Sequence, residues 1–211
     1  MYSYLLKIAL LTFIQWGIPS ISFLPSGFKD LSTLPTVTID KRYATTNNCC
    51  GRVLDSTTNC ILRDIAFQKL ETACTILESE HPGWKFIVFD AYRPLSVQKQ
   101  LWDHVKGTAY ARYVAYPLNG SLHTMGLAID LSLIDQTGKQ IDMGTGFDEF
   151  TPLAAPRNEA EFLRTKKLTP EQYQNRLILR RIMQRAGFIQ LQSEWWHFEA
   201  MHQKTARAKY K

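Results

Sequence analysis

Two short segments that lie far apart in the chain carry side chains able to bind one metal ion. The first runs from Ser121 to Asp130 and includes His123, and the second is Glu194-Trp-Trp-His197. Two imidazoles and one carboxylate can fill three positions around Zn²⁺ and leave the fourth to a water, whose proton a spare carboxylate can accept. These residue types in this pattern therefore predict a zinc site that hydrolyses amides.

The spacing of the first segment requires the backbone to fold back. A fully extended chain would separate His123 from Asp130 by roughly 23 Å, at about 3.3 Å per residue, so the two could not share an ion. Gly126 is expected to supply the bend, because glycine adopts positive φ at low cost. Residues 127–133 then alternate like a buried strand, and Asp130 would lie within it.

In the second segment, Glu194 and His197 are three residues apart. On a flat strand this spacing would point the two side chains to opposite faces. We therefore expect Glu194 to precede a strand that carries His197.

Further motifs accompany the two segments. They are Tyr43-Ala-Thr-Thr-Asn-Asn48, Asp90-Ala-Tyr-Arg93-Pro94 and Met143-Gly-Thr-Gly-Phe-Asp148. With these motifs in this order, residues 28–200 resemble the D-alanyl-D-alanine dipeptidases of the VanX type, within the wider lysostaphin, D-Ala-D-Ala metallopeptidase and hedgehog-like group.

The resemblance implies one Zn²⁺ per chain, bound by His123, Asp130 and His197, with Glu194 as the general base and Arg93 stabilising the oxyanion. The chemistry of each residue type agrees with that role. A carboxylate can take a proton from water and pass it to the leaving amine. A guanidinium stays charged and offers a planar set of donors to a negatively charged tetrahedral oxygen.

The resemblance also implies that Asp148 binds the ammonium of a dipeptide, with Ser121 and Tyr43 as further substrate contacts. An exopeptidase needs a fixed carboxylate for that ammonium, and Asp148 meets the need. The carboxylate end of the substrate has no equally clear partner in the sequence.

These features predict zinc-dependent hydrolysis of D-Ala-D-Ala, in cell-wall precursor turnover or glycopeptide resistance. One alternative is a D,D-carboxypeptidase or peptidoglycan endopeptidase, which would need an open cleft; Asp148 and the tyrosine-bearing loop 108–120 favour a closed one. Another is a non-catalytic zinc-bearing binding module, which would require neither Glu194 nor Arg93.

Length and charge are those of a single compact domain. The chain has 211 residues and a net charge of +6, without a basic block before the tail 204–211, so nucleic acid is not an expected partner. The tail is expected to be a solvated end, with contact to anionic envelope polymers as the weaker alternative. Oligomeric state is not predicted by any feature of the sequence.

The first residues differ from the rest. Residues 1–22 combine Lys7, an apolar stretch and small residues, as in a secretory signal peptide, which leaves residues 23–211 as the dipeptidase domain. We expect a periplasmic or secreted protein with no stable membrane association after cleavage. An uncleaved anchor and a buried N-terminal segment are the alternatives.

The cysteines are compatible with export. Cys49, Cys50, Cys60 and Cys74 allow three complete pairings. We prefer a Cys50–Cys60 disulfide and interpret Cys74 as a small buried hydrophobe on a helix.

Apolar periodicity and end signals predict helices and strands in alternation. The helices are expected at 61–80, 95–105 and 170–186, and the strands at 84–90, 127–133, 188–191 and 195–198. The order predicts an α+β fold, with a central, mostly antiparallel sheet that carries the zinc site and helices packed against it.

Overall fold

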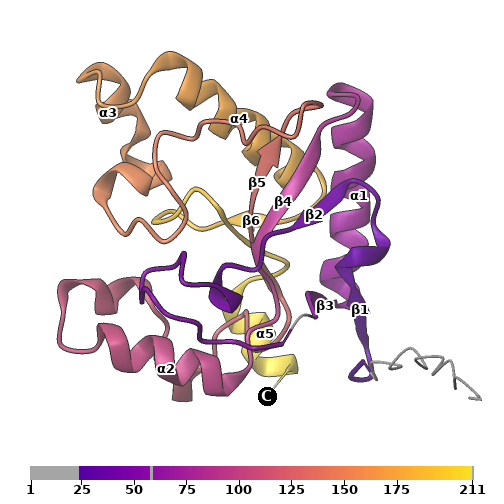
Figure 1. Ribbon diagram of the computed structural model, residues 1–211, viewed down its shortest axis with the longest axis vertical. Coiled ribbons are helices and arrows are strands. Elements are labelled where there is room, and N and C mark those ends of the chain that lie inside the picture. Colours follow the sequence, from indigo (N-terminus) through magenta and orange to yellow (C-terminus); the bar gives the residue numbers. More distant parts are fainter. Residues whose placement is uncertain (1–23, 58, 211) are drawn as a thin grey trace, which may run out of the picture.

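The computed structural model describes residues 24–57 and 59–210 (Figure 1). The signal peptide predicted at 1–22 lies outside this range. Among the residues described, no helix combines the length and the apolar character needed to cross a membrane.

A mixed sheet forms the centre of the fold. Its strands, in spatial order, are β2 (Val37–Ile39), β4 (Lys85–Asp90), β5 (Ala128–Ile134), β7 (His197–Glu199) and β6 (Ile189–Gln190). β2 and β4 pair in parallel and every other pair is antiparallel. The α+β prediction, with a mostly antiparallel sheet, is confirmed.

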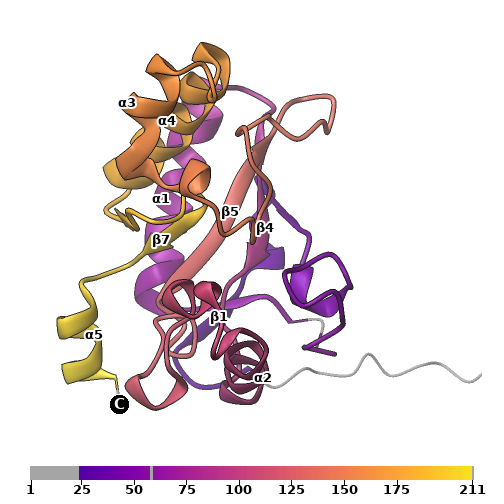
Figure 2. The same ribbon diagram turned by 90° about the vertical axis from the view of Figure 1, so that its left-hand side faces the viewer.

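Helices α1 (Asp64–Glu80) and α4 (Pro170–Arg185) lie side by side on one face of this sheet, as Figure 2 shows. The remaining elements surround the sheet. They are β1 (Phe28–Asp30), β3 (Ile61–Arg63), α2 (Leu95–Val105), α3 (Glu159–Arg164) and α5 (Gln203–Lys209), with short 3-10 turns between them.

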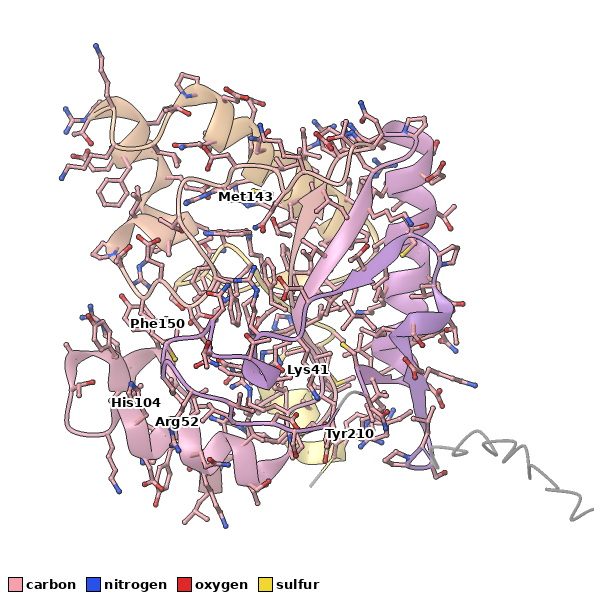
Figure 3. All side chains as sticks on the ribbon, viewed as in Figure 1. Lys41, Arg52, His104, Met143, Phe150 and Tyr210 are labelled. Atoms are coloured by element: carbon pink, nitrogen blue, oxygen red, sulfur yellow. The ribbon has the colours of Figure 1, made fainter. Side chains whose placement is uncertain are left out.

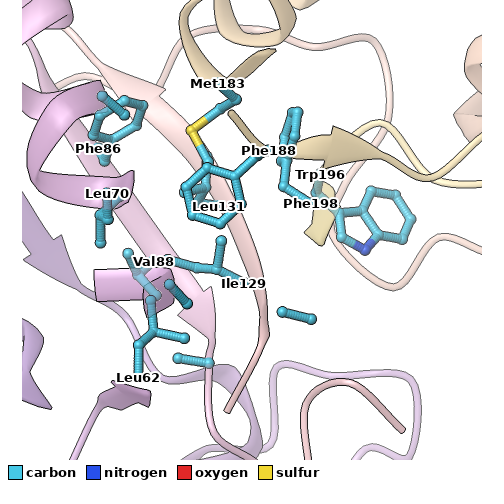
Figure 4. Packing of buried hydrophobic residues seen from close by; sticks show 14 of the residues in the cluster. Leu62, Leu70, Phe86, Val88, Ile129, Leu131, Met183, Phe188, Trp196 and Phe198 are labelled. Carbon is cyan, nitrogen blue, oxygen red and sulfur yellow. The ribbon is translucent and has the colours of Figure 1, made fainter. Parts of the chain in front are cut away.

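The helix-covered face contains the main hydrophobic core. Ile129 and Leu131 of β5 pack with Leu70 of α1 and Met183 of α4 (Figure 4). Because side chains alternate along a strand, Asp130 points to the opposite face. The apolar core thus fixes the strand that presents Asp130, the carboxylate predicted to bind metal.

The helix predicted at 61–80 begins three residues late. Residues 61–63 form β3, whose backbone pairs antiparallel with β1, and α1 starts at Asp64. Both structures bury apolar residues at these positions, so periodicity could not separate them. The α4 prediction is confirmed: Thr169 and Gln172 form a reciprocal capping box before the helix.

The Cys50–Cys60 disulfide prediction is wrong, because all four cysteines are free thiols. Cys60 lies in the main core, whereas Cys50 packs against a second apolar cluster beneath α2. Cys49 and Cys50 approach each other, with 3.9 Å between their Sγ atoms. Cys74 is buried in the core as expected.

Gly126 forms the tight turn predicted between His123 and the strand. Its φ is 67°, and its amide donates to the carbonyl of His123 at 3.0 Å. A Cβ here would lie 2.4 Å from Cε1 of Phe28 and 3.1 Å from the backbone nitrogen of Arg63. Both backbone conformation and close packing therefore require glycine.

Replacing Gly126 with Ala should lower the free energy of unfolding by about 2–4 kcal/mol, since positive φ and crowding act together. Gly138→Ala is the matched control: its φ is 83°, but nothing lies within 4 Å of the added Cβ. Its loss should be about 1–2 kcal/mol. Urea unfolding measures both, and equal losses would contradict the packing requirement.

Candidate active site

Strand pairing brings the predicted metal ligands together. Asp130 of β5 lies directly opposite His197 of β7, with 2.9 Å between Asp130 Oδ1 and His197 Nδ1. The turn before β5 places His123 Nε2 at 3.1 Å from His197 Nδ1 and 3.3 Å from Asp130 Oδ2. One donor atom from each residue lies within 4.8 Å of the others, and all three residues are buried.

Neighbouring groups orient both imidazoles. His123 Nδ1 donates to the carbonyl of Ala91 at 2.8 Å, which leaves the Nε2 lone pair facing Asp130 and His197. His197 turns its other nitrogen, Nε2, toward Glu199 Oε1 at 3.6 Å. Such outer contacts fix the tautomer and the ring orientation of metal-binding histidines.

The electrostatics of the cluster suit a cation. Burial alone would lower the pKa of His197, but hydrogen bonds to Asp130 and Glu199 raise it to about 10. Burial would raise the pKa of Asp130, yet the adjacent His123 and His197 hold it well below its usual range. Positive charge is thus favoured where the three donors meet, and two nitrogens with one carboxylate are a donor set that Zn²⁺ accepts.

Glu194 lies beside this cluster, in the turn before β7, as expected. Its side chain is buried, and Oε1 has no hydrogen-bond partner among the described residues. Burial is the main cause that raises the pKa of Glu194 to about 8. A buried carboxylate that lacks a partner needs an explanation, and a base with a pKa near neutrality is one.

A β-bulge positions Arg93 and its carboxylate partner. The register of β4 against β5 shifts between Val88 and Asp90, so that Asp90 pairs with Asp130 and both side chains reach the site face. Asp90 Oδ2 accepts from Arg93 Nε at 2.9 Å and lies 2.7 Å from its Nη2. The guanidinium therefore stays charged, and the negative charge of Asp90 raises its pKa against the effect of burial.

Two further contacts hold Arg93. Its Nη1 donates to Oε1 of the fully buried Gln98 at 2.9 Å, and Gln98 Nε2 donates to the carbonyl of Ala115 at 2.8 Å. The ring of Tyr43 lies beneath the guanidinium, 4.8 Å from ring centroid to Cζ. Gln98 links Arg93 to the loop after α2, a role that its sequence context does not indicate.

Asp148 lies against the hydroxyl end of Tyr43. Its Oδ1 accepts from the Tyr43 hydroxyl at 3.2 Å, and its Oδ2 accepts from the amide of Cys49 at 3.2 Å. The backbone of Asp148 has a φ of 59°, in the left-handed region. Aspartate adopts this region more readily than most residues other than glycine. Burial, only partly offset by the Cys49 amide and by Arg93, raises the pKa of Asp148 to about 6.

One cavity of about 310 Å³ joins these groups. It is lined by every residue that the sequence assigned to the site: Tyr43, Arg93, Ser121, His123, Asp130, Asp148, Glu194 and His197. Ser121 Oγ also accepts from the His123 amide at 3.2 Å, so part of its role is to shape the turn.

The loop 108–120 lines the cavity, as its tyrosines predict: Tyr113 and Tyr116 form part of the wall, and Tyr113 stacks on Phe150 with 5.1 Å between ring centroids. The wall also includes Phe150, Glu199 and Arg207, which the sequence did not identify. Phe150, labelled in Figure 3, lies above α2. Glu199 follows His197 by two residues, a strand period that could have revealed it. Arg207 had no such signal.

This site is of the kind used by hydrolytic metallopeptidases: two histidines and a carboxylate that converge, a separate buried carboxylate, and a charged arginine in one cavity. Comparison with known proteins agrees. Residues 26–211 match the family model described as D-ala-D-ala dipeptidase, peptidase M15. The chain belongs to this zinc-dependent peptidase family.

Individual relatives carry the same name. A D-alanyl-D-alanine dipeptidase of Escherichia coli K12 is 34% identical over 171 residues, covering 81% of this chain and 82% of the relative. One from Synechocystis is 31% identical, covering 65% of this chain and 68% of the relative. One from Enterococcus faecalis V583 is 27% identical, covering 76% of this chain and 84% of the relative. The chain is a peptidase.

Zinc should stabilise the folded chain through the three clustered ligands. At a free Zn²⁺ concentration one hundred times Kd, the free energy of unfolding should rise by about 2.7 kcal/mol. The rise is measured as a higher melting temperature when Zn²⁺ is added back to chelator-treated protein. His197→Ala should remove the zinc-dependent shift, whereas His104→Ala should keep it, because His104 is exposed on α2 (Figure 3). An unchanged shift in His197→Ala would contradict the assignment.

Asp148→Asn should stabilise the protein at pH 7.5 but not at pH 4. The folded-state pKa of about 6 exceeds the usual 3.8, so wild-type stability falls as pH rises through this window. Asparagine tolerates positive φ and removes the charge. We therefore expect the free energy of unfolding at pH 7.5 to rise by about 1–2 kcal/mol, as measured by urea unfolding. Asp103→Asn, at an exposed position, should change little at either pH. A stability difference that does not change with pH would contradict a raised pKa of Asp148.

Proposed function

We propose that this chain hydrolyses the dipeptide D-Ala-D-Ala with one bound Zn²⁺. Membership in the family and the names of its relatives support the substrate. The observation that carries the proposal is the cavity itself: a three-donor cluster, an unpartnered buried carboxylate and a carboxylate suited to an ammonium line the same small space.

His123, Asp130 and His197 would hold the ion, whose Lewis acidity polarises the scissile carbonyl and lowers the pKa of an attacking water. Glu194 accepts the proton of that water and then donates it to the leaving amine. Its buried position makes this proton easy to hold near neutral pH.

Arg93 supplies fixed positive charge at the carbonyl oxygen as negative charge develops there. Asp90 and Gln98 hold the guanidinium in place, so little reorganisation is needed during the reaction. Asp148 binds the substrate ammonium, and Tyr43 and the Cys49 amide orient its two oxygens. Ser121 and Tyr43 are further contacts on the cavity wall.

The alternatives fit the cavity less well. A carboxypeptidase or endopeptidase must admit a longer chain on the N-terminal side of the scissile bond, where Asp148, held by Tyr43 and the Cys49 amide, presents a carboxylate suited to a free ammonium. A non-catalytic zinc module has no use for the buried Glu194, whose Oε1 has no hydrogen-bond partner in the part of the chain that the structure describes.

We further propose that the protein is exported and acts on cell-wall precursors, either in their turnover or in glycopeptide resistance. The support for export is the composition of residues 1–22. N-terminal sequencing of the protein recovered from the periplasm or the medium tests it, and a mature chain that still begins at Met1 would contradict cleavage.

Glu194→Gln should bind zinc as the wild type does but lose about 100- to 10,000-fold in kcat, because the amide cannot accept the proton. The matched control is Glu78→Gln, an exposed substitution on α1, which should keep full activity. Zinc content by metal analysis and kcat are measured together. A Glu194→Gln variant with wild-type kcat would exclude this residue as the base.

The substrate prediction is checked by incubating the purified protein with D-Ala-D-Ala, L-Ala-L-Ala and a muropeptide, with and without chelator. We expect chelator-sensitive cleavage of D-Ala-D-Ala. Preferential cleavage of the muropeptide would instead support the endopeptidase or carboxypeptidase alternative, and no cleavage of any would support the non-catalytic module.

A further inference from the structure

A free dipeptide is a zwitterion, so a cavity built for it needs a cation as well as Asp148. We infer that Arg207 of α5 binds the substrate carboxylate and thereby selects free dipeptides. This inference rests on the proposed dipeptidase function and adds a residue that neither the sequence motifs nor the resemblance assigned.

Three arginines line the cavity: Arg93, Arg112 and Arg207. Arg93 is held by the buried Asp90 and by Gln98, and lies 3.8 Å from Asp130 through Nη2, so its position is fixed beside the metal ligands. The carboxylate partner should therefore come from the other two.

Arg112 lies on the ammonium side. Its guanidinium lies over the ring of Tyr113, 5.0 Å from the centroid, and Tyr113 stacks on Phe150. The Phe150 amide donates to the carbonyl of Asp148 at 3.0 Å. A cation on this side would draw the substrate carboxylate toward Asp148, the wrong end of the cavity.

Arg207 lies on the opposite side of the metal cluster. His197 faces Asp130 and His123 through Nδ1, and faces Glu199 through its other nitrogen. Glu199 Oε1 accepts from Gln203 Nε2 at 3.0 Å, and Gln203 is one helical turn from Arg207 on α5.

In Figure 2, α2 and α5 lie on opposite sides of the lower end of the molecule. Arg207 lines the cavity from α5, whereas Arg112 and Tyr113 line it from the segment that follows α2. A dipeptide bound across the cluster would place its ammonium at Asp148 and its carboxylate at Arg207.

The Arg207 guanidinium retains donors for a ligand. Its Nη2 contacts the Gly120 carbonyl and Gln203 Oε1, each at 3.5 Å, which is the outer limit of a hydrogen bond. Among residues 24–57 and 59–210, no carboxylate forms a salt bridge with it. Glu199, the nearest acid along this path, is occupied by His197 and Gln203.

The test compares D-Ala-D-Ala with D-alanyl-D-alaninamide, which lacks the carboxylate charge. The wild type should prefer the acid over the amide in kcat/KM. Arg207→Gln should lower kcat/KM for D-Ala-D-Ala about 10- to 100-fold, chiefly through KM, and leave the amide within about twofold. Arg112→Gln, the matched control, should keep the wild-type preference. Arg207 is exposed, so an unchanged melting temperature is expected for its variant.

Each other outcome has a distinct meaning. If Arg207→Gln keeps the preference, or if Arg112→Gln removes it, the inference is wrong while the dipeptidase function stands. A wild type that cleaves acid and amide equally also overturns the inference alone. A wild type that cleaves neither overturns the proposed function, and the inference with it.

Discussion

The antiparallel pairing of β5 with β7 is the constraint on which the site depends. It places Asp130 opposite His197, so that a carboxylate and an imidazole from distant segments meet on one sheet face. The Gly126 turn then returns His123 to the same point. A register slip of one residue would move Asp130 to the helix-covered face. The apolar contacts of Ile129 and Leu131 therefore hold the predicted metal ligands in register.

Around this pairing, buried charged side chains lie next to side chains of opposite charge. Asp90, Arg93 and Asp130 lie within one network, and the bulge in β4 allows Asp90 to enter it. Most of these groups have partners, which makes the unpartnered oxygen of Glu194 exceptional among them. Strands β5 and β7 hold Asp130 and His197, and the segments around the sheet bring the other cavity residues to them: Arg93 from the turn before α2, Asp148 from the segment after β5, and Glu194 from the turn before β7.

Much of this arrangement could be predicted from local signals. The ligand motifs, the capping box at Thr169 and the period of β5 are short-range patterns, and the residues they named all line one cavity, although their roles stay predictions. What failed depended on long-range packing. Residues 61–63 form a strand because β1 pairs with them. Cys60 packs in the main core, whereas Cys50 packs against the second apolar cluster. Arg207 lay in a tail expected to be solvated, and only the folding of α5 against the cavity revealed it.

Binding of a single divalent ion by His123, Asp130 and His197 can be tested by anomalous diffraction at the zinc edge, from crystals of the zinc-loaded protein. We expect one peak per chain about 2.0–2.2 Å from His123 Nε2, His197 Nδ1 and an Asp130 oxygen, with Glu194 outside the coordination sphere. A peak coordinated by other residues, or by the opposite nitrogen of either histidine, would contradict it.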